Sequence, residues 1–324
     1  SCRGAIMSRS DSMSTFAVNV TGLCRSFRGR PALDDIDLQI PVGSIFGLVG
    51  LNGAGKTTLI RHLIGAFVAQ QGTVRVLGMD PVADSQSVLR RVGYLSEEDS
   101  MPSWMRVGEL VDFSRAIYDT WDDAYATKLM DEFGLSRMDK LSSLSKGLRA
   151  RAGLLVAIAY RPELLILDEP SSGLDPLARR DILEAIIRTI SDEGRTVLFS
   201  SHLLDEVDRV CDSIALMRAS RIIETTTVDQ LQSRYEEIVC RSDTESPPAI
   251  RGVFDWQRDE SEWSGVVDRQ HASGGEVNLP VDVALISRRP VTLHRWFAAR
   301  AGTVASTASE STDGNSSEVT SHVG

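Results

Sequence analysis

The sequence predicts an α/β fold in which a mixed sheet is flanked by helices. Short apolar runs suited to buried strands lie at Ile45–Val49, Leu164–Leu167 and Thr196–Ser200. A segment with apolar residues at helical spacing, Thr58–Ile64, follows the first run. Polar or glycine-rich residues come directly after all three runs, and open α/β sheets place their ligands at the carboxyl ends of their strands. We therefore expect the functional residues to gather at this edge of the sheet.

The chain of 324 residues is predicted to contain a main domain, an accessory region and two disordered ends. The main domain covers residues 16–227 and begins with a strand expected at Phe16–Val20. A helical subdomain is inserted at about 97–158. A small C-terminal accessory region covers 228–301. Its weaker signals predict a closing helix at Thr292–Ala299 and short strands around Ile238–Arg241, Val253–Trp256 and Val277–Leu285. Residues 1–15 are small and polar, and 302–324 contain no leucine or aromatic residue. Such segments cannot bury enough apolar surface to offset the cost of ordering, so we expect both ends to be disordered.

Composition and charge argue against several classes of protein. The net charge of −10 disfavours a nucleic-acid partner. The four cysteines are scattered and predict reduced thiols rather than disulfides or a metal site. No apolar run approaches the roughly 18 residues that cross a bilayer, and the N-terminus lacks the apolar core of a signal peptide. Any work at a membrane is therefore expected from the cytosolic side, through a partner.

The glycine-rich segment after the first apolar run fits the pattern G-x-x-x-x-G-K-[ST] of a phosphate-binding loop. It consists of Gly50, Leu51, Asn52, Gly53, Ala54, Gly55, Lys56, Thr57 and Thr58. Its glycines allow a tight turn that brings N–H groups against phosphate oxygens, and the following helix presents its positive end to the same anion. Lys56 can reach the outer phosphates, and the Thr57 hydroxyl can hold Mg²⁺. A chance match has odds on the order of one in a hundred in a chain of this length.

Two carboxylates, Asp168 and Glu169, end the second apolar run. One of them can reach Mg²⁺ through water, and the other can polarise an attacking water. The alternative is a solvated acidic turn. That alternative loses weight because the phosphate-binding loop already needs both roles.

Four further residues carry weaker signals. Phe27 stands among polar neighbours and can either stack on a nucleotide base or be a partly buried loop aromatic. Ser145 is a candidate N-cap. Lys146 lies in the first turn of the same helix, where its positive charge is destabilising by roughly 0.3–1 kcal/mol because it opposes the helix dipole. A bound anion would make the same charge stabilising. Taken alone, Lys146 is more simply an exposed lysine. His202 follows the third run; a lone histidine is usually structural, but this one again stands at the carboxyl end of a strand.

Taken together, these segments resemble the ATP-binding subunit of an ABC transporter over roughly Phe16 to Thr227. The resemblance covers six motifs in order: Phe27 for the aromatic that stacks on adenine, Gly50–Thr58 for Walker A, Leu144–Leu148 for the signature LSGGQ, Leu164–Glu169 for Walker B, Ser172–Asp175 for the D-loop and His202 for the switch histidine. Within the signature, Ser145, Lys146 and Gly147 are the residues expected at the ATP of the facing subunit. The order and spacing make the resemblance very specific. It implies a P-loop ATPase core that binds ATP and Mg²⁺.

Two positions depart from the family pattern. Glu97 stands where the family usually has a glutamine, in the loop that links the Mg²⁺ site to the membrane partner. The resemblance therefore implies that Thr57, Asp168 and Glu97 surround the metal. The signature has Lys146 in place of its first glycine and leucine in place of its glutamine. Ser145 and Gly147, which in the family contact the γ-phosphate, remain; similar substitutions are familiar in exporter-type subunits.

The resemblance also implies a mechanism and a location. Two ATPase domains, in a homodimer or heterodimer, close head-to-tail over two ATP molecules, each held between Walker A of one domain and the signature of the other. Glu169 acts as general base and His202 holds the γ-phosphate. Closure and opening drive a separate membrane-spanning permease, an exporter, from the cytoplasmic face of the cell membrane. Residues 228–301 loosely resemble the accessory tail of exporter ATPases.

Two other functions compete with this interpretation. A soluble ABC-type ATPase acting on a nucleic-acid or ribosome partner is the first alternative. Those families carry long coiled-coil insertions or two tandem ATPase domains, and this sequence has neither. A nucleotide-binding regulator without turnover is the second, and the intact Glu169 and His202 disfavour it.

Overall fold

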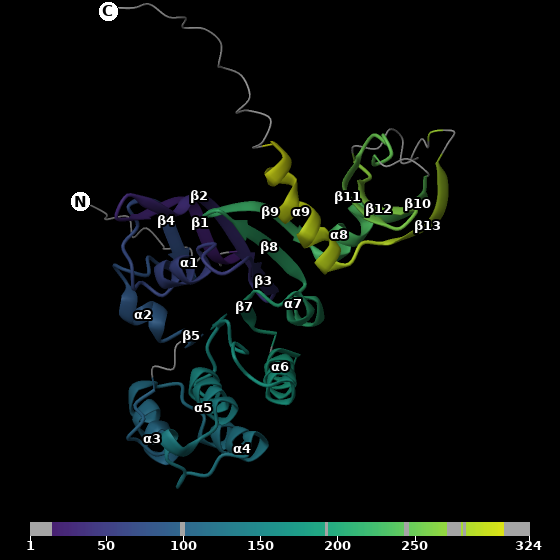
Figure 1. The fold of residues 1–324 in the computed structure, drawn as a ribbon. Coiled ribbons are helices and arrows are strands. Elements are labelled where there is room, and N and C mark those ends of the chain that lie inside the picture. Colours follow the sequence, from purple (N-terminus) through teal and green to yellow (C-terminus); the bar gives the residue numbers. More distant parts are fainter. Residues whose placement is uncertain are drawn as a thin grey trace, which may run out of the picture. The chain divides into compact units, whose positions relative to one another are not determined.

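The computed structural model describes residues 15–97, 101–191, 194–242, 246–270, 280 and 283–307. It divides into two compact units, Ser1–Thr225 and Thr226–Gly324, which are described separately below (Figure 1). The ends predicted to be disordered fall largely outside the described residues. No helix of the described part is both long and apolar enough to cross a membrane.

The first unit opens with a three-stranded antiparallel sheet in the order β2-β1-β4. Its strands are β1 (Phe16–Phe27), β2 (Arg30–Pro41) and β4 (Gln71–Val76). The sequence predicted that the first strand ends at Val20, which is wrong. Shifts of register around Gly22, whose φ is +56°, let β1 bend and continue to Phe27.

A six-stranded sheet in the order β5-β6-β7-β3-β8-β9 forms the centre of this unit. Its strands are β3 (Ile45–Val49), β5 (Val92–Leu95), β6 (Leu164–Asp168), β7 (Thr196–Ser201), β8 (Ser213–Arg218) and β9 (Arg221–Thr227). The neighbours from β5 to β8 are parallel, and β3, β6 and β7 are the three apolar runs of the sequence. The predicted α/β fold is confirmed.

Helices follow several of these strands. They are α1 (Lys56–Leu63), α2 (Ser85–Leu89), α3 (Val107–Ile117), α4 (Asp123–Phe133), the short 3-10 helix η1 (Leu141–Ser143), α5 (Lys146–Ile158), α6 (Pro176–Ser191) and α7 (Leu204–Val210). Helices α3, α4 and α5 lie within the predicted insertion, and α5 packs against α3, α4, β5 and α6. The apolar faces of α3 and α4 are buried, except Ile117, the last residue of α3, which is 45% exposed.

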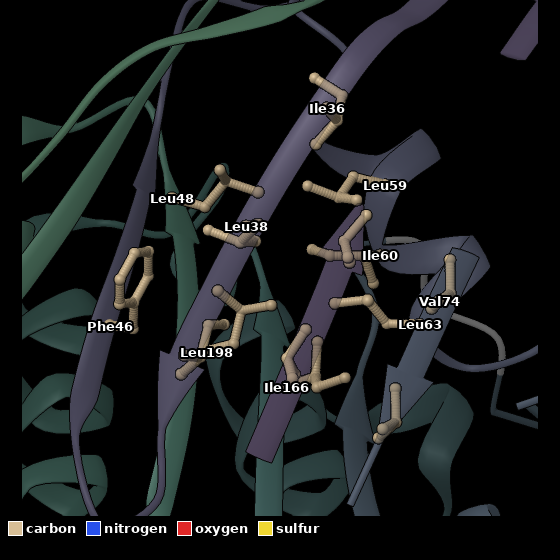
Figure 2. Packing of buried hydrophobic residues seen from close by; sticks show 14 of the residues in the cluster. Ile36, Leu38, Phe46, Leu48, Leu59, Ile60, Leu63, Val74, Ile166 and Leu198 are labelled. Carbon is tan, nitrogen blue, oxygen red and sulfur yellow. The ribbon is translucent and has the colours of Figure 1, made fainter. Parts of the chain in front are cut away.

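The core of the first unit joins both sheets and α1. Buried residues from β2, β3, α1, β4, β6 and β7 form one cluster, which includes Leu38, Leu48, Ile60, Ile166 and Leu198 (Figure 2). Burial of each such side chain contributes roughly 1.5–3 kcal/mol. This packing fixes the strand that enters the phosphate-binding loop and the helix that leaves it.

The described residues of the second unit form a four-stranded antiparallel sheet in the order β11-β12-β10-β13 and two helices. The elements are α8 (Val228–Arg234), β10 (Tyr235–Arg241), β11 (Val253–Asp259), β12 (Glu262–Asp268), β13 (Ala284–Pro290) and α9 (Leu293–Thr307). Strand β12 was not predicted from the sequence. The last strand was expected at Val277–Leu285, a range that lies largely outside the described residues, whereas β13 begins at Ala284.

Helix α9 is also longer than predicted. It was expected at Thr292–Ala299, yet it continues to Thr307 and so takes in residues 302–307 of the tail that was predicted to be disordered. Each residue added to a nucleated helix gains a backbone hydrogen bond, so a helix can extend past its last apolar side chain.

Candidate active site

The phosphate-binding loop connects β3 to α1, and its glycines are required by the local backbone. A Cβ on Gly50 would come within 2.3 Å of the carbonyl oxygen of Met217. Gly55 has a φ of +110°, and a Cβ there would lie 2.5 Å from the carbonyl oxygen of Ala32. Gly55 is also the N-cap of α1 and provides no side-chain cap. The first N–H groups of α1 thus remain available to an anion.

Lys56 is held inside this loop. Its side chain is 6% exposed, and its Nζ donates to the carbonyl oxygen of Gly50 at 2.7 Å and lies 3.1 Å from Glu169 Oε1. The loop residues line a cavity of about 390 Å³ that also contains Glu97 and Glu169. The structure therefore brings three sequence-predicted groups, the loop, Glu97 and Glu169, around one space.

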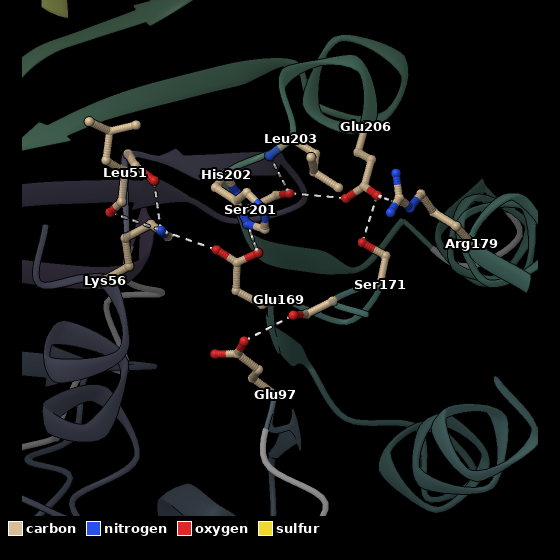
Figure 3. A network of polar contacts seen from close by, with 12 residues as sticks. Leu51, Lys56, Glu97, Glu169, Ser171, Arg179, Ser201, His202, Leu203 and Glu206 are labelled. Atoms are coloured by element: carbon tan, nitrogen blue, oxygen red, sulfur yellow. Dashed lines mark hydrogen bonds and ion pairs between the residues drawn. The ribbon is translucent and has the colours of Figure 1, made fainter. Parts of the chain in front are cut away.

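Glu169 and His202 are in direct contact (Figure 3). His202 Nδ1 lies 2.7 Å from Glu169 Oε2, and Glu169 is 5% exposed. The contact follows from the sheet, because β6 and β7 are adjacent parallel strands with Asp168 opposite Ser200. Glu169 has a φ of +50°, a left-handed conformation that turns the chain sharply away from the strand.

Asp168 is almost fully buried, at 1% exposure. Neither of its carboxylate oxygens accepts a hydrogen bond within the described part of the chain. Burial raises the pKa of Asp168 above its ordinary value; the nearby hydroxyls of Thr57 and Ser200 oppose this rise, and the charges of Glu169 and Glu97 add to it. An orphaned buried carboxylate beside a threonine hydroxyl is a pair of hard oxygen ligands.

These residues fit a magnesium ion of the kind that shares its coordination with a substrate. Among the described residues, no group of three or more His, Cys, Asp or Glu side chains could hold a metal on its own. Mg²⁺ is usually bound by one or two carboxylates together with substrate phosphates rather than in an all-protein cage. Glu97 fits the metal site less closely than Asp168 does. It is exposed, and its Oε1 accepts a hydrogen bond from Ser172 Oγ at 3.0 Å.

The signature segment lies apart from the phosphate-binding loop cavity. Ser145 is the N-cap of α5, and its Oγ accepts from the backbone N–H of Leu148 at 3.2 Å, so the predicted cap is confirmed. Lys146 is exposed and lies over Gly173, where a Cβ would come within 2.3 Å of its Nζ. It lines a second cavity, of about 190 Å³, which also contains Glu97 and Glu169.

Two other predicted residues have local partners. The Phe27 ring is 40% exposed, packs edge-on against Phe67 with ring centroids 5.6 Å apart, and lies under the Arg25 guanidinium. Within the described chain it is not among the residues that line the phosphate-binding loop cavity. Asp175 Oδ1 accepts from the N–H groups of Leu177 and Ala178, both at 3.0 Å, at the start of α6.

A buried polar group beside this site was not predicted from the sequence. Glu206 accepts hydrogen bonds from Ser171 and Ser201, and all three are buried. Its spacing offered a signal, since Glu206 stands four residues after His202, about one helical turn. An acidic residue in a helical segment is more often solvated, so this signal was weak.

A phosphate-binding loop with an acidic pair at the end of another parallel strand of the same sheet defines a nucleotide hydrolase of the P-loop class. A sequence model of the ABC transporter family matches residues 33–172. A second model, described as "AAA domain, putative AbiEii toxin, Type IV TA system", matches residues 140–208.

Relatives extend the match to most of both chains. The ABC transporter ATP-binding protein YtrB of Bacillus subtilis is 30% identical over 72% of this chain and 80% of its own length. The daunorubicin/doxorubicin resistance ATP-binding protein DrrA of Streptomyces peucetius is 36% identical over 70% of each chain. A solved ATP-binding subunit of an ABC transporter superposes with a TM-score of 0.61 at 27% identity, over 67% of this chain and 92% of that one.

The chain belongs to the ABC transporter ATP-binding family. It is an ATP-binding and ATP-hydrolysing subunit of an ABC transporter, which confirms the function inferred from the six motifs.

Proposed function

We propose that this subunit hydrolyses ATP with Glu169 as the general base and His202 as its partner at the γ-phosphate. The observation that carries the proposal is the contact of Glu169 with both Lys56, at 3.1 Å, and His202, at 2.7 Å. Phosphate oxygens compete with Glu169 for the Lys56 ammonium. ATP that draws Lys56 toward its outer phosphates leaves the Glu169 carboxylate to His202 and to a water molecule.

Thr57 and Asp168 are proposed to hold Mg²⁺ next to these phosphates. Held there, Mg²⁺ would supply positive charge that neutralises the negative charge developing on the phosphates during hydrolysis. The orphaned carboxylate oxygens of Asp168 support this assignment. Glu97, which lines the same cavity, is proposed to lie near the ion and to signal its presence to the Ser172 segment through the Oε1–Oγ hydrogen bond.

The second half of each ATP site is proposed to come from a second subunit, in a homodimer or heterodimer. The signature segment Ser145–Gly147 would face the triphosphate bound to the phosphate-binding loop of its partner. The N-terminus of α5, with Ser145 as its cap, supports this arrangement because a helix N-terminus and Lys146 both attract anions. Phe27 and Asp175 are proposed to contact adenine and the facing subunit, respectively.

The subunit is proposed to drive a separate membrane permease in the export direction, at the cytoplasmic face of the membrane. The relative named for daunorubicin and doxorubicin resistance supports export. Resistance is the outcome expected when a transporter moves a toxic compound out of the cell.

The catalytic assignment is tested by separating nucleotide binding from hydrolysis. Glu169→Gln keeps the size of the side chain but removes the base, so phosphate release from Mg-ATP should fall by roughly 100-fold or more. The affinity for a fluorescent ATP analogue should remain close to that of the wild type. Phosphate release at the wild-type rate would overturn Glu169 as the base.

The coupling assignment needs a membrane experiment. The chain is expressed alone and together with a candidate multi-span permease, and the membranes are sedimented. Recovery in the membrane pellet only upon co-expression supports a permease partner. Equal recovery on liposomes that contain no protein contradicts it.

A further inference from the structure

Glu206 is a buried carboxylate that the proposed reaction does not use. It lies in the first turn of α7 and is 3% exposed. Its carboxylate accepts hydrogen bonds from Ser171 Oγ at 2.6 Å and from Ser201 Oγ at 3.0 Å (Figure 3). Arg179 Nε of α6 lies 3.5 Å from the same carboxylate. Three segments of the chain therefore meet at one charge.

Two of these segments carry the reactive side chains. Ser171 follows Glu169 by two residues, and Ser201 directly precedes His202. The Ser201 hydroxyl is itself fixed, because it also accepts from the backbone N–H of Leu203 at 3.0 Å. Both serines are fully buried. Glu206 thus links the Glu169 segment to the His202 segment through these two serines.

A purely local role does not account for these contacts. A glutamate in the first turn of a helix often closes a capping box by reaching back to the N-cap N–H. Glu206 instead bonds two hydroxyls that lie outside α7, and it does so as a buried charge. Burying a carboxylate is costly even when it is paired, and an apolar side chain of similar size often serves stability as well.

The backbone at Glu169 gives a reason for such a tie. A non-glycine residue at φ +50° is strained, and strain of this kind persists only where surrounding contacts hold it in place. On one side the Glu169 N–H donates to the carbonyl of Ser200 at 3.0 Å. On the other, the Ser171–Glu206 hydrogen bond fixes the chain just after the turn.

We infer that Glu206 is a positioning residue for ATP hydrolysis. Through Ser171 and Ser201 it sets the distance and angle between Glu169 and His202, and Arg179 balances its charge. The inference rests on the proposed roles of Glu169 and His202. It assigns to Glu206 no contact with ATP, so its removal should affect the rate of hydrolysis and leave ATP binding unchanged.

Steady-state kinetics of the full chain test this expectation. Glu206→Gln keeps the shape but removes the charge and one acceptor, and Glu206→Ala removes the tie altogether. We expect kcat to fall by about 10- to 100-fold, with the larger loss for alanine, since small misplacements of reacting groups cost about this much. The KM for ATP should stay within about 2-fold of the wild type. Asp208→Ala, which removes an exposed carboxylate from the same helix, is the matched control and should leave both constants unchanged.

A merely structural role is separated by double-mutant cycles in kcat. If Glu206 acts by placing His202, then Glu206→Gln should cost much less in a His202→Ala background than in the wild type. Ser171→Ala and Ser201→Ala should each reproduce part of the loss and should not add to it. These serine variants also carry the test if the Glu206 variants fail to fold.

Three results would overturn the inference: wild-type kcat in the folded Glu206 and serine variants, a rise in KM at unchanged kcat, or fully additive effects with His202→Ala. Glu169→Gln is measured alongside. Wild-type turnover in Glu169→Gln refutes the proposed base itself, whereas an inactive Glu169→Gln with an unaffected Glu206→Gln refutes this inference alone.

Discussion

Two lysines begin helices in the first unit, and they differ in how the chain holds them. Lys56 begins α1, is 6% exposed, and contacts the Gly50 carbonyl and the Glu169 carboxylate. Lys146 begins α5 and is exposed. The α1 helix has a glycine N-cap without a side-chain cap, whereas the Ser145 hydroxyl caps α5.

This difference separates two parts of the site, which we call the loop half (Lys56, Thr57, Asp168, Glu169 and His202) and the signature half (Ser145, Lys146 and Gly147). The loop half is organised by contacts within one chain, and its groups are positioned against one another. The signature half presents a helix N-terminus and a cation at the surface. Our proposal that the signature half serves a second subunit accounts for this contrast.

The largest expected effect concerns Lys56. Lys56→Ala removes the cation aimed at the outer phosphates and should lower the rate of ATP hydrolysis by roughly 100- to 1,000-fold. It should also weaken ATP binding, as measured by titration with a fluorescent nucleotide. If hydrolysis persists at the wild-type rate, the loop half is not where the phosphates bind.

The next effect connects the two halves. Glu169→Gln given ATP and Mg²⁺ should accumulate as a dimer, because ATP bridges the loop half of one subunit and the signature half of the other. We expect the apparent dimer dissociation constant to fall at least tenfold, about 1.4 kcal/mol, in light scattering. A second substitution, Ser145→Arg, places bulk in the facing phosphate site and should restore the monomer without preventing ATP binding. An ATP-loaded Glu169→Gln protein that remains monomeric would favour a heterodimer over a homodimer.

The loop half was largely predictable from sequence, and the reason lies in its strands. Each reactive group follows an apolar run that becomes a buried parallel strand, so Lys56, Glu169 and His202 had to meet at one edge. Contacts made from outside those strands could not be predicted. Glu206 reaches Ser171 and Ser201 through the packing of α7, and Phe27 reaches Phe67 through the bend in β1. Neither packing arrangement leaves a local pattern in the sequence.

The second unit was predicted less well for a related reason. Its strands contain charged side chains that find ion-pair partners only in the folded state. One is Glu237, which forms ion pairs with Arg289 and Arg295. In the sequence alone, a buried acidic residue cannot be distinguished from an exposed one, because its ion-pair partner is not known. Strand β12, which was not predicted, ends in a second buried acidic residue, Asp268. Its carboxylate forms an ion pair with Arg234 at 2.8 Å.

Asp168 tests whether burial of a carboxylate in the loop half lowers the stability of the folded protein. Burial raises its pKa, so the folded protein binds this proton more tightly than the unfolded chain does. Stability is therefore lost as pH rises from the ordinary aspartate pKa of about 3.9 through the raised folded value. Asp168→Asn should abolish hydrolysis yet raise the melting temperature at pH 7 by a few degrees, and this gain should shrink as the pH falls. Asp131→Asn, at an exposed carboxylate, is the control; a lower melting temperature for Asp168→Asn at pH 7 would contradict the sign.

Glu97 lines both the phosphate-binding loop cavity and the cavity beside Lys146, and its side chain is exposed. Glu97→Gln keeps an oxygen that can accept the Ser172 hydrogen bond. Basal ATP hydrolysis should therefore stay within about 2-fold of the wild type. Complete loss of turnover, measured at saturating Mg²⁺, would show that the Glu97 charge takes part in the reaction directly.

The smallest effect concerns Lys146. Its removal should stabilise the isolated subunit and weaken the ATP-bound dimer. In the isolated subunit, its charge opposes the dipole of α5, so Lys146→Ala should raise the free energy of unfolding by roughly 0.3–1 kcal/mol at low salt. In the ATP-bound pair, the same charge would face a phosphate of the other subunit, and its removal should weaken ATP-dependent dimerisation of Glu169→Gln. Denaturant titration measures the first quantity and light scattering the second. Lys128→Ala, which removes an exposed lysine from the interior of α4, is the control for a general loss of positive charge. A variant that is more stable but dimerises as well as its parent would show that Lys146 takes no part in the composite site.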